Sequence, residues 1–201
     1  MLTRSDVVLK MAYIAWMTND IRLREELCTY LPALESYNRA SYIGIVLART
    51  ESKVEQEYVL QSLGDRSADI RDEAYKVLSE MSLSPEQYQH IEELLRFKYS
   101  EMRINAINLL MKQPEAQLAA SIRRLLSDKN AERRLAGLDM MKSIRNVDFL
   151  KDSYQKLLST VREIQKPNAK EKILIESLIG DGTEQSPTSN YTRENGFGLY
   201  D

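Results

Sequence analysis

The sequence predicts an all-α protein, and three observations support this fold class. Apolar residues recur at the spacing of one helix face, as in Leu118, Ile122 and Leu125. Alternating β-branched stretches bounded by two-residue turns, which would indicate strands, are missing. A sequence motif also recurs at intervals of about 32 and then about 31 residues. With 201 residues, 43% of them hydrophobic, the chain can bury a sizeable core.

Capping residues and glycines predict where the helices begin and end. Ser84, Pro85 and Glu86 supply a capping hydroxyl, a preset φ and an acidic first turn, and Pro114 begins a similar pattern. Four of the seven glycines lie in the last 22 residues, so the helical region is expected to end near Gly180. We expect helices over 5–18, 20–31, 37–50, 52–63, 67–82, 85–97, 99–112, 114–127, 130–145, 147–165 and 168–179.

The repeated motif lies in the segments 65–78, 98–110 and 128–141. In each segment an arginine precedes an alanine by three positions: Arg71 with Ala74, Arg103 with Ala106, and Arg133 with Ala136. An alanine at the closest contact between two helices lets their backbones approach. Each segment follows another helix with paired apolar residues, so the unit is a helical hairpin of about 30 residues. One hairpin cannot bury both its faces, so the copies are expected to stack.

Asp65 precedes Arg71 by six positions, and Asp128 precedes Arg134 by the same spacing. With the small residue in the second helix, this pattern resembles the HEAT-repeat family over 52–145, although the middle copy has Phe97 in place of the aspartate. The resemblance implies a right-handed α–α superhelix, a HEAT-like solenoid of about five helical hairpins, over residues 1–179. Residues 180–201 are then an irregular C-terminal tail or the start of a linker to a further domain. The chain is also similar to the HEAT segments of larger bacterial proteins of unknown function.

The resemblance specifies architecture rather than chemistry, because unrelated activities use the same scaffold. It implies a non-catalytic protein–protein interaction scaffold whose concave face, formed by the second helix of each repeat, meets another protein or a further domain of the same polypeptide. The expected contacts are polar or aromatic positions on those helices: Arg71, Tyr75, Arg103, Asn108, Arg134 and Lys142. Arg71 and Arg134 equally suit an internal ladder with Asp65 and Asp128.

No residue pattern predicts catalysis, a metal site or a cofactor. Gly180-Asp181-Gly182 lacks the following helix and lysine of a phosphate-binding loop. Cys28 lies on an apolar face and is expected in the core, whereas His90 is expected to be solvated on a polar stretch. We therefore expect no catalytic residue, no metal ligand and no cofactor.

Both ends of the array carry apolar residues that need cover. Trp16, with Tyr13 and Met17, is expected to pack against the next helix rather than form a platform for nucleic-acid bases. The last expected helix, EKILIESLI, is apolar on more than one side. The tail, through Phe197 and Tyr200, or a further domain is expected to cover it.

The net charge and its distribution along the chain bear on the remaining alternatives for partner and localisation. The net charge of −2 predicts no general attraction to nucleic acid or anionic membranes, and without a membrane-spanning run or secretory signal the chain is expected to be cytoplasmic. Residues 50–95 contain eleven acidic and four basic side chains, whereas 96–145 contain five acidic and eleven basic ones. The alternative to a protein scaffold is therefore a nucleic-acid-binding or DNA-glycosylase-like HEAT protein that uses the basic 96–145 half. The adjacent acidic repeat argues against nucleic acid.

Overall fold

A computed structural model of the chain describes residues 3–50, 52–98, 100–147 and 150–180. Over these ranges the protein is all-helical, as predicted, with no strand. The α-helices are α1 (Arg4–Thr18), α2 (Ile21–Tyr30), α3 (Ser36–Ile45), α4 (Lys53–Ser62), α5 (Ala68–Ser79), α6 (Pro85–Leu94), α7 (Ser100–Leu110), α8 (Glu115–Leu126), α9 (Ala131–Ile144), α10 (Lys151–Arg162) and α11 (Ala169–Ile179). Two short 3₁₀ helices, η1 (Leu31–Ala33) and η2 (Leu47–Arg49), flank α3.

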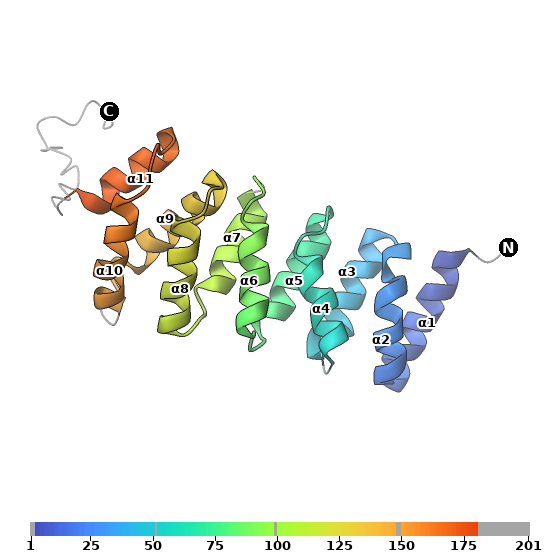
Figure 1. The fold of residues 1–201 in the computed structure, drawn as a ribbon. Helices are drawn as coiled ribbons and strands as arrows, with labels where there is room; N and C mark the ends of the chain where they lie inside the picture. The colour runs from blue at the N-terminus through green and yellow to red at the C-terminus, as the bar shows by residue number, and fades with distance from the viewer. Residues whose placement is uncertain (1–2, 51, 99, 148–149, 181–201) are drawn as a thin grey trace, which may run out of the picture.

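The helices form two rows along the length of the molecule (Figure 1). The even-numbered helices make one row and the odd-numbered helices the other, and α1 and α11 lie at opposite ends of the molecule. In each hairpin from α4–α5 to α10–α11 the two helices pack against each other. Each of these helices also packs against a neighbouring helix of its own row. The first helix differs, because α1 packs mainly on α2 and η1. Successive hairpins therefore lie side by side.

Many of the helices begin after a residue whose side chain caps the first turn. As predicted, Ser84 caps α6: its hydroxyl accepts a hydrogen bond from the backbone N–H of Gln87 at 3.3 Å, with Pro85 as the first helical residue. Pro114 is itself the N-cap of α8 and has no capping hydroxyl. The helix expected over 37–50 ends at Ile45 and continues as η2. In that conformation the carbonyl of Arg49 accepts a hydrogen bond from Arg24 at 3.2 Å.

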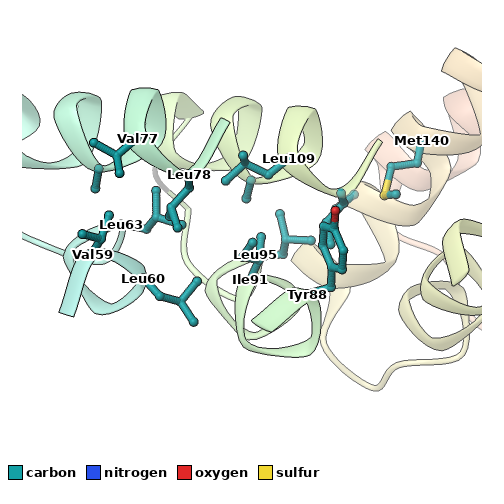
Figure 2. Close-up of a cluster of buried hydrophobic side chains, with 14 of the residues drawn as sticks. Val59, Leu60, Leu63, Val77, Leu78, Tyr88, Ile91, Leu95, Leu109 and Met140 are labelled. Carbon is teal, nitrogen blue, oxygen red and sulfur yellow. The ribbon is translucent and has the colours of Figure 1, made fainter. Parts of the chain in front are cut away.

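One continuous core extends from Val8 in α1 to Leu178 in α11. In its middle, side chains from both rows face one another (Figure 2): Val59 and Leu60 of α4 with the adjoining Leu63, Val77 and Leu78 of α5, Tyr88 and Ile91 of α6 with the adjoining Leu95, and Leu109 of α7. The three alanines of the repeated motif, Ala74, Ala106 and Ala136, are buried in this core. Because protein interiors are close-packed, a larger side chain at these buried positions would have to displace its neighbours.

Enlarging one of these alanines tests the close packing. We expect Ala74→Leu to lower the free energy of unfolding by about 1–3 kcal/mol, because added methylenes force neighbouring side chains off their rotamers. Ala68→Leu is the control, because Ala68 is exposed at the start of the same helix and its replacement should change stability by no more than about 0.5 kcal/mol. Urea titration measures both. Equal effects of the two substitutions would contradict this packing.

The C-terminal helix keeps part of its apolar surface exposed. Leu178 is buried and Leu174 packs at the edge of the core, but Ile173 is exposed. Gly180 follows as the C-cap of α11. The tail that was expected to cover this helix, residues 181–201, lies outside the described residues.

Candidate docking groove

The two arginines of the expected ladder, Arg71 and Arg134, bind backbone carbonyl oxygens rather than the aspartate carboxylates. Nη1 of Arg71 donates to the backbone carbonyls of Asp65 and Arg66, at 2.9 and 3.0 Å. Nη1 of Arg134 donates likewise to the carbonyls of Asp128 and Lys129, at 3.0 and 2.8 Å. These arginines therefore satisfy carbonyl groups in the links between helices.

The carboxylates of Asp65 and Asp128 bind other groups. Oδ1 of Asp65 accepts from the N–H of Ser67 at 2.9 Å, and Oδ2 pairs with Arg39 of the preceding hairpin at 2.9 Å. Asp128 is arranged similarly, with Oδ2 at 2.9 Å from Nη1 of Arg133. Because each carboxylate already closes its own link, the arginine six residues later meets the carbonyls instead.

The other expected contact residues do not gather at one site. Arg103 on α7 pairs with Asp139 at 2.5 Å and with Glu132 at 3.5 Å, both on α9. Tyr75 is half-buried against the core. Asn108 and Lys142 are exposed on different helices, α7 and α9. Three of the six residues therefore hold the array together, and the remaining three are dispersed.

The basic half of the chain is joined to the acidic repeat by ion pairs. Glu92 of α6, which is buried, pairs with Arg124 of α8 at 2.6 Å. Arg133 of α9 reaches Glu93 at 3.2 Å and also approaches Glu92 at 3.9 Å. The hydrogen bond to Glu92 raises the pKa of Arg124, so its guanidinium stays protonated. Two basic residues of the 96–145 half, Arg124 and Arg133, are thus paired with carboxylates of the acidic repeat.

This pairing predicts weak, non-specific contact with nucleic acid at most. A protein that neutralises six to ten phosphates loses about 10³–10⁵ in affinity between 50 and 200 mM salt. We expect titrations with duplex DNA and duplex RNA at these two salt concentrations to show no binding whose affinity falls this steeply with salt. A steep salt dependence that disappears in an Arg123→Glu/Lys129→Glu variant, in which both changed residues are exposed, would support the nucleic-acid alternative instead.

The expected burial of Trp16 is wrong. Trp16 is 50% exposed, Tyr13 is 60% exposed, and Met17 is also exposed. The reason is that α1 buries its small residues, Val8, Ala12 and Ala15, against the neighbouring elements. The bulkier side of α1 therefore faces away from the core. On that side the ring centroids of Tyr13 and Trp16 lie 5.8 Å apart.

The exposed aromatic side of α1 forms one wall of a groove whose other wall is α3. The volume of this groove is about 700 Å³. Its lining is largely apolar: Leu9, Lys10, Ala12, Tyr13, Ile14 and Trp16 from α1, Leu34, Asn38, Ser41, Tyr42, Ile45 and Val46 from α3 and its flanks. Ile45, at the end of α3, is 64% exposed. We call this feature the α1–α3 groove.

Tyr42 closes the groove toward the core, and it is itself buried. Its hydroxyl has no hydrogen-bond partner among the described residues, and burial raises its pKa well above the usual range. Nearby Cys28 is buried, as predicted, and its thiol donates to the carbonyl of Arg24 at 3.4 Å. Burial raises the pKa of Cys28 to about 12, so the thiol stays protonated at neutral pH. His90 is half-buried on α6.

An acidic depression lies on the other side of α3, against α5. Tyr37, Ala40 and Ser41 line it from α3, and Asp69, Asp72, Glu73 and Lys76 line it from α5. Ser41 also lines the α1–α3 groove, so the two features share a border. Gly44 has no side chain, which leaves room for the carboxylate of Glu73 against α3. An apolar surface on α1 and α3 thus adjoins an acidic one on α5.

Of the groove residues, sequence reasoning singled out Tyr13 and Trp16 and missed the others, among them Leu9, Ile14 and Ile45. Apolar residues surround the first helix, from Val7 to Met17, on more sides than one neighbour can bury. The last helix shows the same pattern, with apolar residues on more than one side. The pattern could not show which side of α1 would remain exposed.

The fold and the groove define an all-α protein of side-by-side helical hairpins with an exposed apolar groove near one end. The chain belongs to a family of unknown function, DUF5724, whose profile matches residues 1–201. No curated protein and no solved structure matches it. Within the described ranges, no helix has the length and apolar character needed to cross a membrane, and no group of three or more His, Cys, Asp or Glu side chains is placed to hold a metal ion.

Proposed function

We propose that this chain is a HEAT-like repeat module, a non-catalytic scaffold that binds another protein through the α1–α3 groove. The observation that carries the proposal is the clustering of half-exposed Tyr13, Trp16 and Ile45 around one groove. Large contiguous apolar patches are uncommon on soluble monomers and mark sites of interaction. Tyrosine and tryptophan are also the side chains that most often dominate binding energy at protein interfaces.

The proposed architecture is the right-handed α–α superhelix that the HEAT resemblance implies. The two rows of helices and the buried alanines of the repeated motif support it. In such a superhelix the row of second helices, here α3, α5, α7, α9 and α11, forms the concave face. The α1–α3 groove lies in the odd-numbered row, on the face where a partner is expected.

The composition of the groove favours binding over catalysis. Its lining includes one charged side chain, Lys10, and no pair of groups that could act as acid and base. The buried Cys28 thiol behind Tyr42 stays protonated, which makes it a poor nucleophile. The groove therefore offers apolar contact area rather than reactive groups, and we place this binding activity in the cytoplasm.

Affinity capture with matched variants tests the proposal. The wild-type chain, Ile45→Lys and Ile104→Lys serve as baits in a native lysate. Ile45 lies in the groove, whereas Ile104 on α7 is a similarly exposed isoleucine of the same row, at 58%. Both side chains are on the surface, so thermal melting should show that each variant folds like wild type.

We expect wild type and Ile104→Lys to capture the same discrete protein, and Ile45→Lys to lose it, because a lysine ammonium in an apolar contact must be desolvated. Capture that is unaffected by Ile45→Lys would overturn the proposal. So would a wild-type chain that captures nothing above the Ile45→Lys background.

A further inference from the structure

We propose that the partner segment is an amphipathic helix with lysine or arginine residues along one flank. Its apolar stripe would lie in the α1–α3 groove, and its basic flank would face the acidic depression on α5. This inference rests on the proposed function and names the chemistry of the partner.

The shape of the groove suits a helix. The residues of α3 that line it extend from Asn38 to Ile45, which corresponds to a rise of about 10 Å, or two helical turns. Two turns accommodate anchors at positions i, i+3 or i+4, and i+7 of a bound helix. A peptide that binds by adding a strand would need a free sheet edge for its backbone hydrogen bonds, and the described part of the chain contains no sheet.

The exposure of the walls favours a helix over a small apolar ligand. Binding sites for small molecules usually bury about 70–90% of the ligand surface. Tyr13 and Ile45 on opposite walls remain more than half exposed, so the groove is open along its length. A small ligand would leave much of its own surface in water, whereas a helix covers the groove and keeps its polar side solvated.

The charges around the groove determine which side of the helix must be basic. In the odd-numbered row α3 lies between α1 and α5 (Figure 1). Asp69 and Asp72 are exposed on α5 and form no salt bridge within the described residues, while Glu73 pairs with Lys76 at 2.7 Å. Lys10 lies on the opposite side, on α1. Basic residues facing α5 therefore meet two carboxylates and avoid Lys10.

An unbiased selection tests this chemistry. A library of displayed helical peptides without tryptophan is selected on the full chain, with the Ile45→Lys chain as the counter-selection. We expect the enriched peptides to share an apolar stripe and a lysine- or arginine-rich flank. Trp16, the single tryptophan, then reports binding of one enriched peptide through its fluorescence.

Charge reversal on α5 is the decisive comparison. Asp69→Lys/Asp72→Lys should weaken the enriched peptide about tenfold, and a peptide with glutamates on that flank should bind this variant better than it binds wild type. Asp152→Lys is the control, because Asp152 is an exposed aspartate on α10 in the other row.

The outcomes distinguish this inference from the proposed function. Peptides that depend on Ile45 but show no charge bias, with unchanged affinity for the α5 variant, would overturn the basic flank and leave the groove as a docking site. If no enriched peptide depends on Ile45, the docking proposal itself fails. If laurate binds the groove and no peptide does, a small apolar ligand is the occupant and both proposals are wrong.

Discussion

Replacing Glu55 with alanine is expected to lower the free energy of unfolding by about 3–5 kcal/mol, because it leaves a buried arginine without its counterion. Oε1 of Glu55 lies 2.6 Å from Nε of Arg24, and both side chains are almost fully buried. Arg24 also donates to the side chain of Asn19 at 2.7 Å and to the carbonyl of Arg49. The loss would loosen the contacts among α2, α4 and η2.

Urea denaturation monitored by circular dichroism measures this effect. Glu73→Ala is the control, because its carboxylate forms a partly exposed ion pair with Lys76, and the loss of such a pair should cost less than about 1 kcal/mol. The double variant Arg24→Met/Glu55→Leu removes both charges and is expected to recover most of the lost stability. A Glu55→Ala variant as stable as Glu73→Ala would contradict the role assigned to this pair.

The same device occurs at the other end of the array. Glu171 is fully buried at the third position of α11, as Glu55 is in α4. Its Oε1 accepts from Nε of Arg134 at 2.7 Å, and its Oε2 accepts from the backbone N–H of Asn168, the N-cap residue, at 2.7 Å. In both helices one carboxylate therefore caps the first turn and binds an arginine of the preceding hairpin.

Replacing Trp16 with alanine is expected to weaken binding of the groove's partner about 30-fold or more, which corresponds to about 2 kcal/mol or more. The indole supplies a large apolar surface to the α1 wall of the groove. Because Trp16 is half exposed, the free energy of unfolding should change by no more than about 1 kcal/mol. The substitution therefore separates binding from folding.

Calorimetric titration with the captured partner measures the affinity. Phe97→Ala is the control, because Phe97 is another exposed aromatic residue and lies outside the groove, after α6. An unchanged affinity for Trp16→Ala would show that the aromatic wall of α1 does not contact the partner. A loss of stability as large as the loss of binding energy would show that Trp16 is structural.

Local signals predicted the helices well, because they depend on residues close in sequence. The cap at Ser84 is set by its own neighbours, and the buried alanines follow from a short repeated spacing. The exposure of Trp16 could not be predicted in this way. It depends on which side of α1 meets α2 and η1, and the small residues Val8 and Ala12 occupy that contact.

The candidate site was harder to predict, because spacing brings residues together without fixing which atoms bind. The six-residue spacing from Asp65 to Arg71 places the two side by side, yet the backbone of the link decides that a carbonyl accepts the hydrogen bond. The partner of Arg103 on α9 depends on how adjacent hairpins pack. Several arginines that were expected to contact a partner therefore bind groups within the chain instead.

Site-specific photocrosslinking tests the central claim, that the α1–α3 groove is the docking site, most directly. A benzophenone amino acid replaces Ile45 in one protein and Ile104 in another, and each is irradiated in native lysate. We predict one discrete crosslinked partner from position 45, absent in the presence of an excess of unlabelled wild-type chain, and no such product from position 104. The same product from both positions, or from position 104 alone, would contradict the groove as the place where the partner binds.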